Sequence, residues 1–195
     1  MQVLVPTLSF PACLRQQASP IRAAIFDVDG VLTDGTLYIS EAGETLKAFH
    51  ALDGHGLKLL AQGGITPIVI TGRDSPAVRR RLKDLGIVHA VFGAHDKLAA
   101  AEPLLAQLGL SWAEVAVMGD DWPDLPLLLR AGFAVAPVNA HAEVRAVAHH
   151  VTTESGGHGA ARACCDLLLQ ATGRYDALLH GHLTTLDTTS EGARP

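Results

Sequence analysis

The sequence of 195 residues is poor in cysteine, in basic charge and in long apolar runs, and each shortage excludes a class of protein. The three cysteines, Cys13, Cys164 and Cys165, form no paired framework, and this favours a reducing, cytoplasmic setting. Lys and Arg number 15 against 20 Asp and Glu, so the formal net charge of −5 argues against nucleic acid as a partner. No apolar run approaches the ~20 residues that cross a bilayer, so we expect no membrane partner.

The first 20 residues also lack the pattern of a signal peptide. Three prolines interrupt them, and their one basic residue, Arg15, follows the apolar stretch instead of preceding it. We therefore expect residues 1–20 to be a loose N-terminal extension with one helical turn around Cys13–Ala18.

What remains has the composition of a folded protein, with 48% hydrophobic and 18% charged residues in a length that suits one domain. Short apolar stretches alternate with helical segments, which predicts an α/β fold with a doubly wound parallel sheet. The expected strands are Ala23–Phe26, Thr66–Ile70, Val88–Phe92, Val115–Met118 and Phe133–Ala136. The expected helices are Ala51–Gly63, Ser75–Leu85, His95–Leu108, one beginning at Pro123, and Ala160–Leu169.

A small β-hairpin flap is expected between the first strand and the first helix of the domain. Its strands would be Thr36–Ile39 and Thr45–Phe49, joined by a turn at Glu41–Glu44. We assign residues 21–173 to the folded domain. Residues 174–195 form a C-terminal tail, in which we expect residues 184–195 to be disordered.

Acidic residues follow the first expected strand at once. Asp27 and Asp29 are spaced i and i+2, so their side chains point the same way and repel each other unless a cation lies nearby. Asp and Gly are also ordinary turn residues, so this pair alone leaves a solvated turn open. Thr71 and Asp120 follow two other strands, and ligands of open parallel sheets bind at this edge.

The string from Asp27 to Asp34 resembles the first motif of the haloacid dehalogenase-like phosphohydrolases, and three further motifs of that superfamily follow in order. The resemblance implies that Asp27 is the nucleophile, which becomes an aspartyl phosphate. Asp29 would be the general acid and base. Thr71 would donate to a phosphoryl oxygen, and Lys97 would neutralise charge on the nucleophile and the phosphoryl group.

The fourth motif holds three carboxylates, Asp120, Asp121 and Asp124, directly after a buried strand. Such crowding is destabilising unless the group holds a cation, and hard oxygen ligands beside a phosphate substrate indicate magnesium. The resemblance implies Asp27, Asp120 and the backbone carbonyl of Asp29 as metal ligands. Asp121 and Asp124 would support the ligands or orient the loop. An acidic loop that only caps the following helix is the alternative.

Several later segments resemble the 3-deoxy-D-manno-octulosonate 8-phosphate phosphatase family more narrowly. They are Lys47–Phe49, Asp53–Gly56, Thr71–Arg73, Gly119–Asp121 with Leu125–Pro126, and Gly156–Arg162. The resemblance implies a magnesium-dependent homotetramer of lipopolysaccharide biosynthesis without a cap domain. It also implies that the glycine-rich stretch of a neighbouring subunit covers the active site.

The same resemblance assigns a set of substrate contacts: Asp29, His50, Ala51, Leu52, Asp53, Gly54, Lys58, Arg73, Arg81 and Lys97. His50, Leu52, Lys58 and His158 depart from the family's usual residues. Two alternatives therefore stay open: a phosphatase of a related nonulosonate 9-phosphate, and a non-enzymatic oligomerisation or phospho-acceptor module of the same fold. Asp29 argues against the phospho-acceptor module, because a receiver domain lacks the second aspartate that drives turnover.

Overall fold

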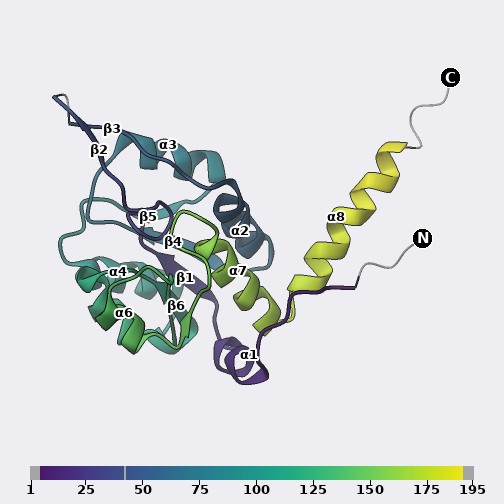
Figure 1. The fold of residues 1–195 in the computed structure, drawn as a ribbon. Coiled ribbons are helices and arrows are strands. Elements are labelled where there is room, and N and C mark those ends of the chain that lie inside the picture. Colours follow the sequence, from purple (N-terminus) through teal and green to yellow (C-terminus); the bar gives the residue numbers. More distant parts are fainter. Residues whose placement is uncertain (1–4, 42, 191–195) are drawn as a thin grey trace.

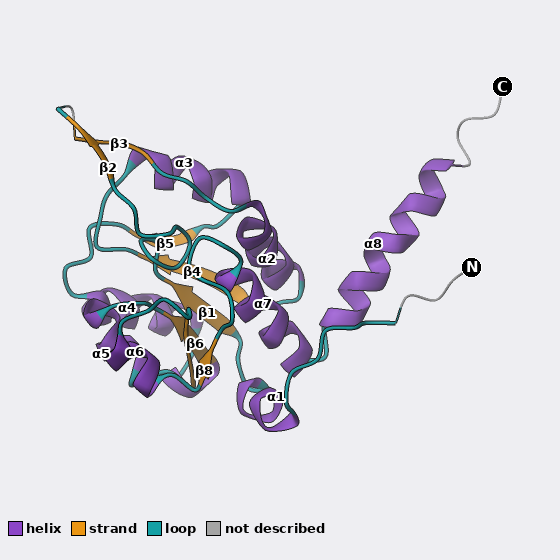
Figure 2. Cartoon of the chain, in the orientation of Figure 1, coloured by secondary structure: helices purple, strands orange, loops and turns teal. Residues whose placement is uncertain are grey.

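The structure, a computed structural model, describes residues 5–41 and 43–190, with the backbone alone for 184–190. A six-stranded parallel sheet lies at its centre, in the order β5-β4-β1-β6-β7-β8. Its strands are β1 (Ala23–Phe26), β4 (Thr66–Ile70), β5 (His89–Val91), β6 (Val115–Met118), β7 (Phe133–Ala136) and β8 (His150–Val151). Helices cover both faces (Figures 1 and 2), so the predicted doubly wound α/β fold is confirmed.

The two faces of the sheet carry separate hydrophobic cores. Alternate residues of β1 point to opposite faces, so Phe26 belongs to one core and Ile25 to the other. The Phe26 core is completed by α1 (Ala12–Ala18), α2 (Ala51–Gln62), α3 (Pro76–Leu85) and α7 (Ala160–Ala171). The Ile25 core is completed by α4 (Lys97–Leu108), α5 (Leu125–Leu128) and α6 (Ala142–Val147). Because β1 is buried on both faces, its carboxyl end is held firmly at the centre of one sheet edge.

The hairpin lies between β1 and α2 and consists of β2 (Tyr38–Ser40) and β3 (Gly43–Leu46). It projects beyond α3 in Figure 1. Both strands are shifted from their predicted bounds, and Ala42 in the predicted turn lies outside the described residues. The second strand ends before Lys47, whose side chain turns into the protein. Among the described residues of this segment there is no cap domain, as predicted.

Both chain ends differ from expectation, although the helical turn predicted around Cys13–Ala18 is present as part of α1. The N-terminal extension is not loose over α1, because Ala18 is fully buried and the Gln170 side chain donates to the Leu8 carbonyl at 2.7 Å. The tail forms α8 (Tyr175–Ser190), which extends away from the body in Figure 1. Residues 184–190, which were predicted to be disordered, are therefore helical. A run without proline permits this helix. Residues 1–4 and 191–195 lie outside the described residues.

The short elements α6 and β8 were not predicted, and both lie after β7. Among the described residues, no helix has the length and apolar character that a bilayer crossing requires.

Candidate active site

The predicted catalytic side chains meet at the carboxyl edge of the sheet. Asp27 follows β1, Thr71 follows β4 and Asp120 follows β6, while Lys97 is the first residue of α4. A cavity of about 470 Å³ lies there, and these four residues and Asp29 belong to its lining. The sheet topology therefore brings together groups that lie up to 93 positions apart (120 − 27) in the sequence.

Lys97 holds two of the carboxylates. Its ammonium lies 2.9 Å from Asp27 Oδ1 and 2.6 Å from Asp124 Oδ1, and all three residues are buried. Burial alone would lower the pKa of Lys97, but the charges of Asp27 and Asp124 raise it above its usual value. The lysine is thus a fixed cation beside the predicted nucleophile.

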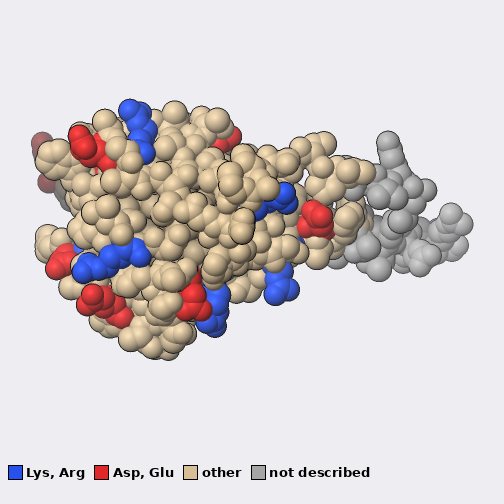
Figure 3. Space-filling view, turned by 90° about the horizontal axis from the view of Figure 1, so that it is seen from below, with Lys and Arg blue, Asp and Glu red and all other residues tan. Residues whose placement is uncertain are grey.

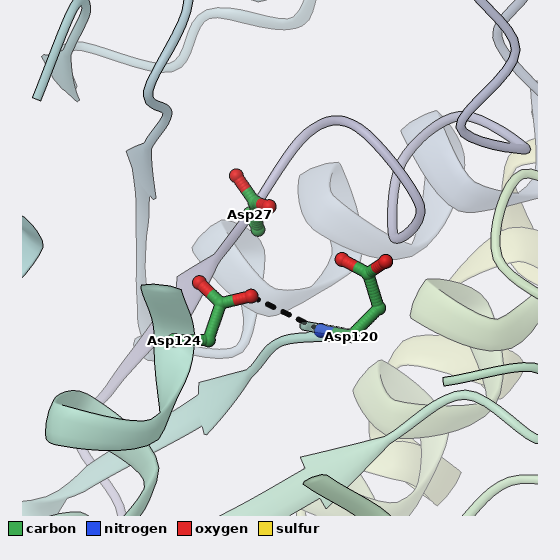
Figure 4. Close-up of side chains that lie close together, drawn as sticks. All are labelled: Asp27, Asp120 and Asp124. Atoms are coloured by element: carbon green, nitrogen blue, oxygen red, sulfur yellow. Dashed lines mark hydrogen bonds between the residues drawn. The ribbon is translucent and has the colours of Figure 1, made fainter. Parts of the chain in front are cut away.

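Asp27, Asp120 and Asp124 form a compact carboxylate cluster, in which one oxygen of each lies within 4.8 Å of the others. Figure 4 shows the three side chains converging, with the backbone N–H of Asp120 donating to Asp124 Oδ2 at 3.1 Å. Burial, and then the charge of Asp124, raises the pKa of Asp27 to about 7. Burial, and then the charges of Asp27 and Asp124, raises the pKa of Asp120 to about 7. The cluster is therefore hard to ionise fully without a cation.

Asp120 offers a free ligand atom to such a cation. Its Oδ1 is buried and has no hydrogen-bond partner among the described residues. Both oxygens of Asp124 are engaged instead, one by Lys97 and the other by the backbone N–H groups of Asp120 and Asp121. The donor set therefore fits a hard divalent cation held by Asp27 and Asp120, with Asp124 orienting the loop.

Gly30, in the first motif, permits the close approach of Asp120, in the fourth motif. A Cβ atom there would lie 2.0 Å from Asp120 Oδ2, and its φ of 96° is in the left-handed region. Both the space and the backbone conformation therefore require glycine.

Asp29 faces the cavity between two cations. Its Oδ1 forms an ion pair with the ammonium of Lys47, and its Oδ2 lies 3.7 Å from Arg73 Nε. Lys47 also lies 3.2 Å from Glu44 Oε2. No role was predicted for Lys47 or Glu44, because only the folded hairpin brings them to the turn that holds Asp29.

Thr71 and Asp121 complete the predicted chemistry at the cavity. Thr71 is buried, its N–H donates to the Val91 carbonyl at 3.0 Å, and its Oγ1 accepts from the N–H of Arg73 at 3.3 Å. Asp121 is exposed and lines the cavity. The hydroxyl of Thr71 is thus placed to donate to a ligand.

Comparisons with known proteins agree with this site. Residues 91–163 match the family model described as haloacid dehalogenase-like hydrolase. The chain is 42% identical over 161 residues to the 3-deoxy-D-manno-octulosonate 8-phosphate phosphatase of Yersinia pestis, covering 83% of this chain and 86% of the relative. It is 43% identical over 160 residues to that of Salmonella typhi, with coverages of 82% and 85%.

A solved structure extends the likeness to the fold. The crystal structure of the 3-deoxy-D-manno-octulosonate 8-phosphate phosphatase from Moraxella catarrhalis, in complex with magnesium ion, phosphate ion and KDO, superposes with a TM-score of 0.83 at 41% identity, over 87% of this chain and 97% of that chain. This chain belongs to the 3-deoxy-D-manno-octulosonate 8-phosphate phosphatase family. The resemblance read from the sequence motifs is thus confirmed.

The substrate contacts that membership of this phosphatase family implies are only partly assembled in the single chain. Asp29, Arg73 and Lys97 line the cavity. The other predicted contacts lie outside its lining, on or beside α2 and α3: His50, Ala51, Leu52, Asp53, Gly54, Lys58 and Arg81. Lys58 is exposed, and Arg81 fills the space that Gly54 leaves open.

Asp53, a predicted substrate contact, faces the start of α7 in this structure. It is buried, and its oxygens accept hydrogen bonds from the backbone N–H groups of Gly159 (3.2 Å) and Arg162 (2.8 Å). N–H groups at the start of a helix have no acceptor within the helix itself, so Asp53 stabilises the beginning of α7 by accepting from them. This capping of α7 explains why the Asp53 carboxylate is buried.

The glycine-rich stretch contacts the first motif within its own chain, and its predicted role over a neighbouring active site stays a prediction. A Cβ atom at Gly156 would lie 1.7 Å from the Gly30 carbonyl oxygen, and the Gly157 N–H donates to the Val31 carbonyl at 2.9 Å. The stretch therefore packs beneath the first motif of its own chain. In this structure it supports the loop that carries Asp29 and Gly30.

Proposed function

We propose that this protein is a magnesium-dependent phosphomonoesterase that hydrolyses 3-deoxy-D-manno-octulosonate 8-phosphate to the free sugar acid and phosphate. The observation that carries the proposal is the arrangement of Asp27, Lys97 and the Asp120 loop around one cavity, with Asp29 at its side. The names of the relatives supply the sugar acid, and the free product would enter lipopolysaccharide biosynthesis.

The reaction has two steps. A carboxylate oxygen of Asp27 attacks phosphorus, the bond from phosphorus to the sugar oxygen breaks, and Asp29 gives its proton to that oxygen. Water then attacks the aspartyl phosphate, and Asp29 takes the proton as phosphate leaves and the Asp27 carboxylate is restored. Lys97 and the Thr71 hydroxyl stabilise charge on the phosphoryl oxygens.

Asp27, Asp120 and the backbone carbonyl of Asp29 would hold the magnesium ion. When bound, the ion neutralises the repulsion between the anionic phosphate and these carboxylates. Lys97 keeps Asp27 in place during the reaction, and Asp124 keeps both Lys97 and the Asp120 loop in place.

The enzyme works as a cytoplasmic homotetramer in this proposal. The exposed apolar residues of the hairpin, Leu37, Tyr38, Ile39 and Leu46, suit an interface between subunits. All three cysteines are free thiols, which suits the cytoplasm. Figure 3 shows basic and acidic side chains interspersed on the face that it draws, which suits a small-molecule substrate and not nucleic acid.

Phosphate release from a panel of substrates tests the proposal. The panel contains 3-deoxy-D-manno-octulosonate 8-phosphate, a nonulosonate 9-phosphate and p-nitrophenyl phosphate, each with and without magnesium. We expect kcat/KM to be highest for the octulosonate ester and to vanish in chelator. A higher value for the nonulosonate ester would overturn the choice of sugar acid, and turnover in excess chelator would overturn the magnesium site.

A further inference from the structure

Lys47 is a buried cation at an unusual place. It follows β3, in a hairpin whose apolar side chains are mostly exposed, yet only 1% of its own side chain is exposed. Burying an ammonium group costs several kcal/mol unless close anions compensate. A lysine at the end of a hairpin could reach solvent, so its burial needs a reason.

The contacts of Lys47 give that reason. Its ammonium pairs with Asp29 Oδ1 and lies 3.2 Å from Glu44 Oε2. Asp29 lies in the turn after β1, and its other oxygen faces Arg73. Lys47 and Arg73 therefore each lie beside a different oxygen of the same carboxyl group.

We propose that Lys47 is a positioning residue for the reaction, which holds the Asp29 carboxyl group where it reaches the leaving oxygen and later the attacking water. This inference rests on the proposed function, because it takes Asp29 as the general acid and base. Lys97 serves Asp27 in the same way. Each of the two reacting carboxylates thus has a buried lysine of its own, one from α4 and one from the hairpin.

A second reading of the same contacts is that Lys47 only fastens the hairpin to the domain. Glu44 separates the two readings, because it forms an ion pair with Lys47 from within the hairpin and, among the described residues, no ion pair with Asp29. Loss of Glu44 weakens the hold on Lys47, whereas loss of the Lys47 ammonium frees Asp29 directly. The leaving group separates them further, since p-nitrophenolate departs without a proton and a sugar alkoxide does not.

The test compares Lys47→Met with the wild-type enzyme, because Met keeps the aliphatic stem and removes the ammonium. With an alkyl phosphate that the wild type hydrolyses, the octulosonate ester first, we expect kcat to fall about 10²-fold, as for a misplaced reacting group, with KM little changed. With p-nitrophenyl phosphate, rapid mixing should show a burst of about one p-nitrophenolate per active site and then slow turnover. Phosphorylation by this ester needs no proton donor, whereas hydrolysis of the aspartyl phosphate needs a base that takes a proton from water.

Three variants make the result specific. Lys47→Arg should recover part of the alkyl phosphate kcat, because it restores a cation. Glu44→Gln should turn over both substrates nearly as fast as the wild type. Lys83→Met, which changes an exposed lysine near the end of α3, should have no effect.

Equal losses on both substrates without a burst, or wild-type turnover of the alkyl phosphate by Lys47→Met, would overturn the inference. Asp29→Asn, measured beside it, tests the proposed function separately. If that change leaves turnover intact, then Asp29 is not the acid and base, and the fault lies in the proposed mechanism. If the octulosonate ester is not hydrolysed, any other alkyl substrate still tests Lys47.

Discussion

At the scale of single residues, the site is a matter of charge balance. The cluster holds three carboxylates, Asp27, Asp120 and Asp124, against the one ammonium of Lys97. Full ionisation would leave two surplus negative charges (3 − 1 = 2), which is the charge of one divalent cation. Because burial and mutual repulsion raise the pKa of Asp120 to about 7, the cluster without metal keeps protons that a cation would displace.

The first prediction follows from this balance and concerns Asp120→Asn. Removing one repelling carboxylate should leave the metal-free protein as stable as the wild type or more stable, with Tm equal or up to a few degrees higher in chelator. Magnesium at a hundred times its Kd should raise the free energy of unfolding of the wild type by about 2.7 kcal/mol, and its Tm accordingly. The Tm of the variant should rise far less. Thermal unfolding with and without magnesium measures both effects. An equal shift in both proteins would contradict a ligand role for Asp120.

The second prediction separates the two aspartates of the first motif. Asp27→Asn should abolish turnover, because the amide cannot attack phosphorus. Asp29→Asn removes only the proton transfer, so a loss of about 10²- to 10⁴-fold is expected with some phosphorylation kept. Acid quench with labelled substrate should trap phosphoenzyme in the Asp29 variant and none in the Asp27 variant. Phosphoenzyme in both would place the nucleophile elsewhere.

At the scale of elements, the buried strands were predictable and the contacts between distant segments were not. The bounds of β1, β4, β6 and β7 match the predictions, because continuous apolar runs bounded by turn residues have few other structures. The catalytic residues Asp27, Thr71 and Asp120 could be found because each directly follows such a strand. Their place at the ends of parallel strands also predicts that they meet.

Other features depend on tertiary contacts that leave no local signal. The segment Lys47–Phe49 carries part of the family resemblance, but only the folded hairpin shows that the Lys47 ammonium reaches Asp29. Asp53 carries a substrate motif in sequence but serves the start of α7, which begins more than a hundred residues later. The two-residue strand β8 is shorter than any pattern that sequence periodicity can register.

The third prediction concerns the connection before β6. Glu114 ends a 3₁₀ turn (Trp112–Glu114), where its carboxylate accepts from the Ser111 N–H at 3.0 Å and from Arg22 Nη1 at 2.9 Å. The hydrogen bond from the Ser111 backbone, followed by that from Arg22, lowers the pKa of Glu114 from 4.5 to about 2. A lowered pKa in the folded state means that Glu114 stabilises the fold above pH 4.5 and loses this contribution as pH falls towards 2.

Glu114→Gln should therefore lower Tm at pH 7, and the difference from the wild type should shrink at pH 3. Glu102→Gln, an exposed change on α4, serves as the control and should alter Tm little at either pH. Thermal unfolding followed by circular dichroism measures all three proteins. If the difference in Tm between the wild type and Glu114→Gln is the same at pH 7 and pH 3, then the ionised form of Glu114 does not stabilise the fold.

At the scale of the whole molecule, the elements around the cavity come from every part of the chain. The glycine-rich stretch before α7 supports the first motif, and the hairpin supplies Lys47. Because most of α7 is buried in the core, residues 156–171 cannot be removed without unfolding the domain. The helix α8 projects beyond the sheet and its flanking helices (Figure 1), but Tyr175 and Leu178 near its start pack against the core.

In the proposed function, the hairpin contributes both to assembly and to the active site. Its Lys47 lies inside the protein against Asp29, while the side chains of its strands are mostly exposed. A tetramer built through the hairpins would cover those apolar residues and fix the segment that carries Lys47. A site with no cap domain also needs cover from elsewhere to exclude water from the aspartyl phosphate.

The last prediction tests this assembly with Ile39→Asp. Ile39 is 63% exposed on β2, and covering such a side chain contributes roughly 1.5–3 kcal/mol per subunit, so a charge there should dissociate a hairpin-built tetramer. The matched control is Val88→Asp, because Val88 is 82% exposed before β5, towards the opposite edge of the sheet. Light scattering should show a tetramer for the wild type and the control and a smaller species for Ile39→Asp.

The Ile39→Asp variant should also lose more kcat/KM on the octulosonate ester than on p-nitrophenyl phosphate, because the larger substrate depends more on cover from a neighbour. A fully active wild-type monomer would show that the cavity of one chain suffices, and the exposed hairpin would then need another partner.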